Sequence, residues 1–205
     1  MALQIGEIRT VTFTDTSLLG SGVGRAEDLA VFCPGMVEGD TAEVRILSVK
    51  KRYAEAEPVR LLTPAPHRCA PDCAAFGRCG GCTFRHISYE AESKLKEKAV
   101  RAALRRFPEI QWEPIFTGAA AQYRNKAVFH LDGQLRAGYY AAATNEHIDL
   151  PGGNCDLLPP LFARIAETTR QILTDFRPQQ SLPFRALAVR KASPVPLPRF
   201  STPIR

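Results

Sequence analysis

Four of the six cysteines in this chain of 205 residues fall between Cys69 and Cys82, and no other feature of the sequence limits the possible folds so strongly. Packing explains the crowding poorly, because a buried cysteine behaves as an ordinary small apolar residue and has no reason to cluster. Residues 1–7 show no signal-peptide pattern, and no apolar run approaches the ~20 residues of a membrane span. We therefore expect a cytoplasmic protein with no membrane partner, in which clustered thiols indicate metal ligation instead of disulfides.

Two ligand sets are compatible with the loop Cys69-x3-Cys73-x5-Cys79-x2-Cys82. A four-iron cluster takes four cysteines, often with one remote in sequence, so Cys155 would complete the set of Cys73, Cys79 and Cys82. A zinc ion could instead be held locally by the four loop cysteines, Cys69 included. The two glycines before Cys82 would let the backbone turn tightly and direct N–H groups at sulfur.

The charge distribution favours a polyanionic partner. The net charge is +6, and the segments 1–66, 67–126 and 127–205 carry −2, +5 and +3, so the basic excess begins with the cysteines. Such an excess binds nucleic acid by counterion release, although a solvated basic face has the same composition. The candidate RNA contacts are Tyr123 as a base-stacking ring, Arg124 and Lys126 as phosphate ligands, and a helical stripe of Lys94, Lys98, Arg101 and Arg105.

Residues 1–62 read as short strands separated by turns. Ala42, Val44 and Ile46 alternate with charged residues, which is the period of a half-buried strand. The run Gly20-Ser-Gly-Val-Gly24 lacks the Lys-Ser/Thr of a phosphate loop and indicates a tight barrel corner. We expect strands at 4–13, 23–26, 29–32, 41–49 and 54–62, and hence a small barrel of the OB type.

After a boundary at Pro64-Ala-Pro66, the pattern becomes mixed. Ser88 is the expected N-cap of a helix running to about Phe107, with an apolar side from Leu95. Strands are expected at 127–131, 135–140 and 147–150, the first two joined at Asp132-Gly133. Pro160 opens a second helix, with Leu161, Ile165, Ile172 and Phe176 on one side. The result is an α+β second domain, followed by a proline-rich tail at 192–205 that we expect to be disordered.

Taken together, these features resemble the N-terminal part of one family, the bacterial 23S rRNA uracil-5-methyltransferases that carry an iron–sulfur cluster. Five stretches carry the resemblance, in the family's order, over roughly residues 3–191. They are Val31–Asp40; Cys73-x5-Cys79-Gly-Gly-Cys82 with His86 and Ser88–Ala91; Tyr123-Arg-Asn-Lys126; Gly138-Tyr-Tyr140 with His147-Ile-Asp149; and Cys155.

The resemblance implies a TRAM β-barrel at 1–63 that helps to hold rRNA and an incomplete, cluster-binding central domain at 64–191. It also implies a four-iron cluster on Cys73, Cys79, Cys82 and Cys155, without a redox step in methyl transfer. Two positions depart from the family pattern. Arg85 stands where a glutamine usually precedes the histidine, and Cys69 is an additional thiol, so zinc remains an alternative to the iron–sulfur cluster.

The family's chemistry requires a cysteine that adds to C6 of uracil and a base that removes the C5 proton, both in a C-terminal Rossmann-like domain. The chain has no Asp-Pro-Pro-Arg-like segment, no glycine-rich strand-to-helix turn and no cysteine after Cys155. We therefore expect no catalytic residue, no Rossmann-like methyltransferase domain and no bound S-adenosylmethionine in these residues, and a reading frame interrupted near Ser193.

Three hypotheses follow from the sequence. The first is the RNA-binding, cluster-binding part of an rRNA uracil-5-methyltransferase, truncated or frameshifted and inactive alone. The second is a free-standing RNA-binding metalloprotein adaptor. The third is a zinc-stabilised interaction module. The sequence identifies no protein partner.

Overall fold

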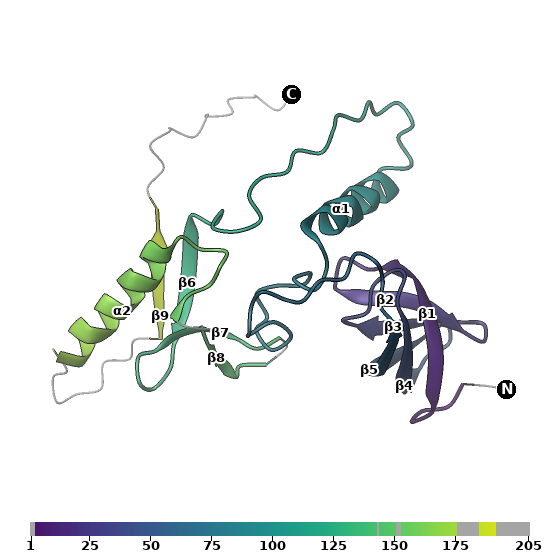
Figure 1. Ribbon diagram of the computed structural model, residues 1–205, viewed down its shortest axis with the longest axis horizontal. Helices are drawn as coiled ribbons and strands as arrows, with labels where there is room; N and C mark the ends of the chain where they lie inside the picture. The colour runs from purple at the N-terminus through teal and green to yellow at the C-terminus, as the bar shows by residue number, and fades with distance from the viewer. Residues whose placement is uncertain (1–2, 143, 151–152, 176–184, 192–205) are drawn as a thin grey trace. The chain divides into compact units, whose positions relative to one another are not determined.

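The computed structural model describes residues 3–142, 144–150, 153–175 and 185–191 (Figure 1). The chain packs as two units, Met1–Gly118 and Ala119–Arg205, and each is described by itself. Among the described residues, the first unit contains a barrel, the cysteine loop and one helix, and the second contains a four-stranded sheet and one helix. Among the described residues, no helix is both long and apolar enough to cross a membrane.

Five strands of the first unit form a closed barrel, as the sequence predicts. The order around the barrel is β1-β2-β3-β5-β4; β3 and β5 are parallel, and pairing of β1 with β4 closes the ring. Ala42, Val44 and Ile46 are fully buried, which confirms the period of two. The strands are β1 (Ile8–Thr16), β2 (Ser21–Ala26), β3 (Leu29–Pro34), β4 (Thr41–Val49) and β5 (Tyr53–Thr63).

The first strand lies later than expected, and the glycine run has a packing role. A turn with Gly6 at φ 84° precedes β1, which therefore starts at Ile8 and not at Gln4. A Cβ on Gly24 would come within 2.4 Å of Val11 Cγ1, and one on Gly22 within 2.8 Å of the Phe13 ring. Glycine is therefore required in β2 for close packing in the barrel, and the interpretation as a barrel corner instead of a phosphate loop holds.

A buried carboxylate joins the barrel to the segment that follows it. Asp40, between β3 and β4, is fully buried and accepts hydrogen bonds from the backbone N–H groups of Val37 (2.8 Å) and Ala65 (2.9 Å). The Arg68 guanidinium donates to both carboxylate oxygens at 2.7 Å and to the Gly35 carbonyl at 2.6 Å. Burial alone would raise the pKa of Asp40, but these donors outweigh it and hold the pKa below its ordinary value.

Arg68 also lies at the base of the cysteine loop. It forms an antiparallel bridge with Ile87, and the Cys69 N–H donates to the His86 carbonyl at 3.1 Å. The Ser88 N–H donates to the His67 carbonyl at 2.9 Å. Next to this short ladder is a small apolar core of Val37, Ala65, Phe84 and Ile87.

Helix α1 (Tyr89–Ala103) begins where predicted but ends early. The Ser88 Oγ accepts from the Ala91 N–H at 3.2 Å, which confirms the N-cap. Leu95 packs against the small core, whereas Val100 and Phe107 are half exposed. The predicted extension to Phe107 is wrong: the helix ends at Ala103, and the apolar residues near its end stay half exposed, so packing stabilises no further turn.

The second unit is an antiparallel sheet of order β8-β7-β6-β9, with one helix packed against it. The predicted hairpin is confirmed: the Asp132 Oδ1 accepts from the backbone N–H groups of Gln134 and Arg136, each at 2.8 Å. Leu135 has φ 61° and belongs to the turn, so the strand starts at Ala137. The elements are β6 (Lys126–Leu131), β7 (Ala137–Tyr140), β8 (His147–Asp149), α2 (Pro160–Asp175) and β9 (Ala186–Arg190).

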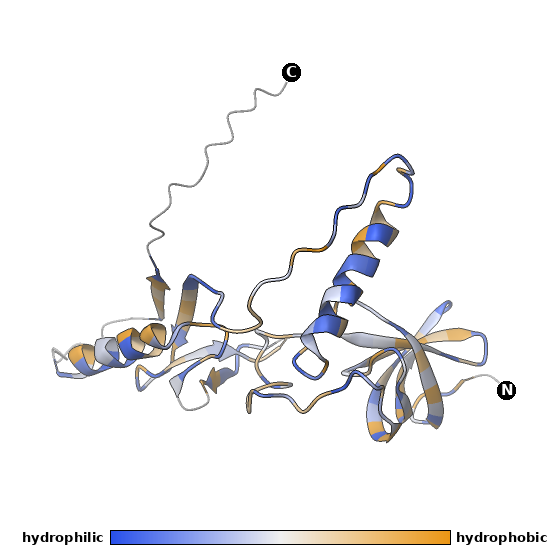
Figure 2. Ribbon diagram, turned by 45° about the horizontal axis from the view of Figure 1, so that its top comes forward, coloured by the Kyte–Doolittle hydropathy of each residue, from blue (hydrophilic) through white to orange (hydrophobic). Residues whose placement is uncertain are grey.

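The face of α2 that packs is not the predicted one. Phe162 and Ala166 are buried against the sheet residues Phe129 and Val189. The predicted apolar side, Leu161, Ile165 and Ile172, is 52, 36 and 50% exposed, and Phe176 lies outside the described residues. Figure 2 shows α2 with hydrophobic and hydrophilic residues along its whole length, whereas α1 is mostly hydrophilic.

The Asp40 network predicts a large and pH-dependent stability effect. D40N should lower the free energy of unfolding by about 3 kcal/mol, because it leaves the buried Arg68 contacts without their charge partner. The depressed pKa stabilises the fold above about pH 4, so the difference between wild type and variant should shrink as the pH falls below that value. Urea denaturation followed by circular dichroism measures both.

The matched control is D72N, which removes an exposed partner of Arg85 on the same unit. It should change the free energy of unfolding by less than about 1 kcal/mol. Equal losses for D40N and D72N would contradict the role given to Asp40.

Candidate metal centre and nucleic-acid interface

The cysteine loop is a compact turn with its thiols at the surface. The Phe76 N–H donates to the Cys73 carbonyl at 3.0 Å and the Cys79 N–H to the Ala75 carbonyl at 2.9 Å. The Gly81 N–H points at the Cys79 Sγ at 3.4 Å. The glycine pair thus directs a backbone donor at sulfur, as the sequence predicts.

Two side chains behind the thiols hold the loop together. Arg85 is 13% exposed and binds the carboxylate of Asp72, the residue before Cys73. The buried His86 ring stacks on Phe76, with 5.2 Å between ring centroids, and burial is the main reason that the pKa of His86 is lowered. The arginine that departs from the family pattern therefore fastens one end of the loop to the other.

The thiols differ in their surroundings. None of the six cysteines, all of which the structure describes, is in a disulfide. Cys33 is fully buried in the barrel, and desolvation raises the pKa of its thiol to about 12, as expected for a core residue. Cys73, Cys79 and Cys82 are half-buried, and Cys69 is exposed with its Sγ 3.9 Å from the Arg85 carbonyl.

The spacing of the loop thiols bears on the choice of metal. Within the part of the chain that the structure describes, no three cysteine Sγ atoms lie within 4.8 Å of one another. Four ligands at ~2.3 Å in a tetrahedron would place sulfur atoms about 3.8 Å apart, so the loop is not a preformed zinc site. A four-iron cluster spaces its thiolates more widely, because each binds a different iron.

Cys155, the remote candidate ligand, belongs to the second unit. It is half-buried and packs against the apolar core of that unit, and the Leu158 N–H donates to its carbonyl at 2.8 Å. The Arg124 N–H donates to the Leu157 carbonyl at 3.0 Å, which brings this arginine to the same place. Burial opposes the charge of Arg124, but the bond to Tyr123, with Tyr139 and Cys155 nearby, holds its pKa above the ordinary value.

The predicted RNA stripe on α1 is largely ion-paired. Lys94 binds Glu90 and Arg101 binds Glu97, and the Arg101 guanidinium lies 4.5 Å from the centre of the Trp112 ring. Lys98 bonds to Asp15 at 2.9 Å and Glu38 at 3.0 Å, both in the barrel, so it links α1 to that domain. Arg105 is exposed. In the second unit, Tyr123 is 57% exposed, Lys126 is exposed and Arg124 is half-buried.

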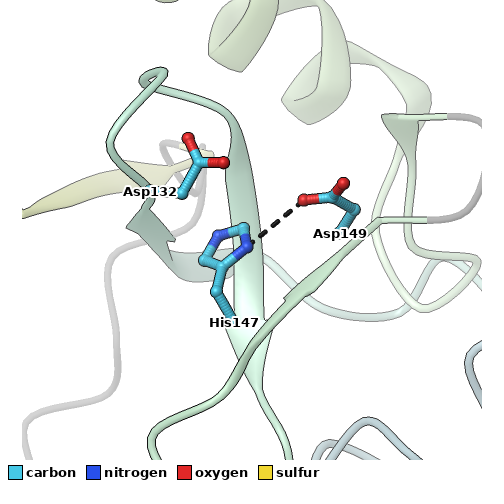
Figure 3. Close-up of side chains that lie close together, drawn as sticks. All are labelled: Asp132, His147 and Asp149. Atoms are coloured by element: carbon cyan, nitrogen blue, oxygen red, sulfur yellow. Dashed lines mark ion pairs between the residues drawn. The ribbon is translucent and has the colours of Figure 1, made fainter.

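A cluster that the sequence did not reveal joins the hairpin turn to β8. One ligand-type atom from each of Asp132, His147 and Asp149 lies within 4.8 Å of the others (Figure 3). The His147 Nδ1 is 3.2 Å from the Asp149 carboxylate, and Arg136 binds Asp132 and Asp149 at 2.7 and 2.8 Å. The guanidinium compensates both carboxylates, so the cluster serves to hold the hairpin against β8.

The barrel places the chain among the TRAM-containing proteins, because residues 2–59 match the TRAM domain. Over most of its length, the chain is homologous to proteins named as RNA methyltransferases. A Nostoc protein named only as an RNA methyltransferase is 38% identical over 178 residues, which are 81% of this chain and 38% of that protein. The 23S rRNA (uracil(1939)-C(5))-methyltransferase RlmD of Klebsiella pneumoniae is 34% identical over 173 residues, which are 82% of this chain and 38% of the relative.

A solved structure has a similar fold. The Pyrococcus abyssi tRNA (uracil-54, C5)-methyltransferase, in complex with S-adenosyl-L-homocysteine, superposes with a TM-score of 0.56 at 17% identity. The match covers 80% of this chain and 37% of that one. The chain therefore spans less than two-fifths of the length of each of these three proteins.

Gly138, the first residue of the Gly138-Tyr-Tyr140 motif, has no room for a side chain. A Cβ there would lie 2.4 Å from the His147 Cε1 and 2.4 Å from the Ile148 carbonyl. G138A should therefore cost about 1–3 kcal/mol through displacement of β8, measured by thermal unfolding and by faster amide exchange in β7 and β8. G133A, where nothing lies within 4 Å of the added Cβ, is the control and should change little; equal effects would contradict this account.

Proposed function

We propose that this chain is the RNA-binding and iron–sulfur-binding part of an S-adenosylmethionine-dependent rRNA uracil-C5 methyltransferase. The observation that carries the proposal is the homology to RNA methyltransferases over about four-fifths of the chain, which includes both the barrel and the cysteine loop. RlmD, by its name, methylates C5 of a uracil in 23S rRNA. The match spans 38% of that relative, so we assign methyl transfer and S-adenosylmethionine binding to the portion outside the match.

The proposed cluster ligands are Cys73, Cys79, Cys82 and Cys155, with Cys69 as the alternative. Two features support a cluster: the half-buried thiols of one loop and a backbone donor at the Cys79 sulfur. The Arg124 guanidinium near Cys155 would further favour a thiolate at the remote position. The cluster would position RNA-binding elements and would take no electrons in the reaction.

The proposed RNA contacts differ in how freely their charges can act. Lys126 and Arg105 are exposed cations, and the exposed Tyr123 ring is available to an unstacked base. Lys94, Lys98 and Arg101 must exchange a carboxylate for a phosphate, which reduces the net gain from each contact. Arg124 is half-buried and bonds to Tyr123, so its proposed role is to hold the Tyr123 ring in position for RNA.

Metal analysis of the full chain, purified without oxygen, tests the cluster. We expect about four iron and four sulfide per chain, with the visible absorption of a cluster. C73S, C79S, C82S and C155S should each lose iron, whereas C69S should keep it. Zinc in place of iron, lost in C69S and kept in C155S, would overturn the cluster and favour the zinc-stabilised module.

Binding to a 23S rRNA fragment at several salt concentrations tests the RNA function. The wild type should bind with a negative salt slope. K94Q/K98Q should reduce the slope by less than one unit, because both ammonium groups already have carboxylate partners. Methylation of the RNA by the chain alone would contradict the assignment of catalysis to another portion. An aggregated, protease-sensitive chain would count against the metalloprotein adaptor, which requires a stable monomeric fold.

A further inference from the structure

Three consecutive cations project from one end of the barrel, and none of them forms an ion pair with a residue that the structure describes. Lys50, Lys51 and Arg52 form the turn between β4 and β5, closed by a hydrogen bond from the Lys50 N–H to the Tyr53 carbonyl at 2.8 Å. All three are exposed. Among the described residues, no acidic side chain lies within ion-pairing distance of them.

The other cations of the barrel are occupied. Arg9 binds Glu7, Arg45 binds Glu57, and Arg60 binds Glu43 through two nitrogens. Arg25 donates to the Asp28 carbonyl at 3.2 Å. The turn is therefore the one place on the described barrel where basic side chains cluster without compensation.

An aromatic pair adjoins this turn on the outside of the barrel. The Phe32 and Tyr53 rings meet edge to face, with centroids 5.8 Å apart and planes at 89°. Val31 and Ala54, paired in register between β3 and β5, are buried, so their neighbours Phe32 and Tyr53 face outward. Tyr53 remains 37% exposed and offers a ring supported from behind by Phe32.

The nearest acid in register is Glu55, opposite Phe32 on β5. Its carboxylate accepts a hydrogen bond from the Ser48 hydroxyl at 2.7 Å. One carboxylate against three cations leaves the surface net positive. We call Phe32, Lys50, Lys51, Arg52 and Tyr53 the β4–β5 patch.

We propose that the β4–β5 patch binds single-stranded RNA, with a base stacked on Tyr53 and the flanking phosphates on Lys50, Lys51 and Arg52. The inference rests on the proposed RNA-binding function and adds its site on the barrel. Uncompensated cations select a polyanion, and an exposed ring selects a base that is not already stacked in a duplex. The same end of a five-stranded OB barrel, at the loop between strands 4 and 5, serves oligonucleotide binding in that fold generally.

Fluorescence-anisotropy titrations with a short oligouridine and with duplex RNA of equal length test the site. The triple variant K50Q/K51Q/R52Q of the full chain should reduce the salt slope for oligouridine by about 2, since each lost phosphate contact removes ~0.7. Y53A should weaken oligouridine about tenfold and leave the duplex unchanged, whereas Y53F should bind as wild type. The control is R45Q/R60Q/K96Q, which removes three ion-paired cations and should leave the slope unchanged.

The outcomes separate the site from the function. If the wild type binds both RNAs but the triple variant matches its control, the β4–β5 patch is wrong and RNA binding stands. If Y53A and Y53F weaken both RNAs equally, the stacking part is wrong. If the wild type binds neither RNA, the proposed RNA-binding function itself fails. Circular dichroism of each variant shows whether the barrel is intact.

Discussion

The buried carboxylate of Asp40 is the interaction on which the first unit depends. It accepts hydrogen bonds from Val37, Ala65 and Arg68, which belong to the β3–β4 connection and to the segment leaving the barrel. An uncompensated carboxylate would be costly at this depth, so barrel, exit segment and arginine must be in place together. Arg68 then begins the ladder that closes the cysteine loop. The barrel is stabilised by its own apolar core, whereas the cysteine loop has almost none. The Asp40–Arg68 ion pair links the two.

The two ends of the cysteine loop differ in role: its base is packed, and its far end carries the thiols. The base is held by the short backbone ladder that Arg68 begins, by the small apolar core and by the stacking of Phe76 on His86. The far end carries the half-buried thiols. A metal group on such thiols would add the cohesion that the few apolar contacts of the loop do not provide, because binding to the folded state alone stabilises it. The pairing of Arg85 with Asp72 supplies part of this cohesion from the chain itself.

What the sequence predicted well was local and periodic. Alternation in β4, the Ser88 cap and the Asp132 turn are each determined by neighbouring residues, and all were found as expected. The errors arose where packing decides. An apolar stripe does run along α2 through Leu161, Ile165 and Ile172. The residues that pack against the sheet are instead Phe162 and Ala166. The Asp132–His147–Asp149 cluster depends on strand register, which spacing along the chain does not reveal.

The net charge of a segment did not predict where unpaired cations lie on its surface. Residues 1–66 carry a net −2, so the sequence directed attention to the basic segment that follows. In the structure, most acids of the barrel pair with its own arginines or with Lys98, while the cations of the β4–β5 turn have none of these partners. A phosphate gains more from an uncompensated cation than from one that must first leave a carboxylate. The RNA site proposed on this surface is therefore argued from which charges are already paired, and the net charge of a segment does not report that.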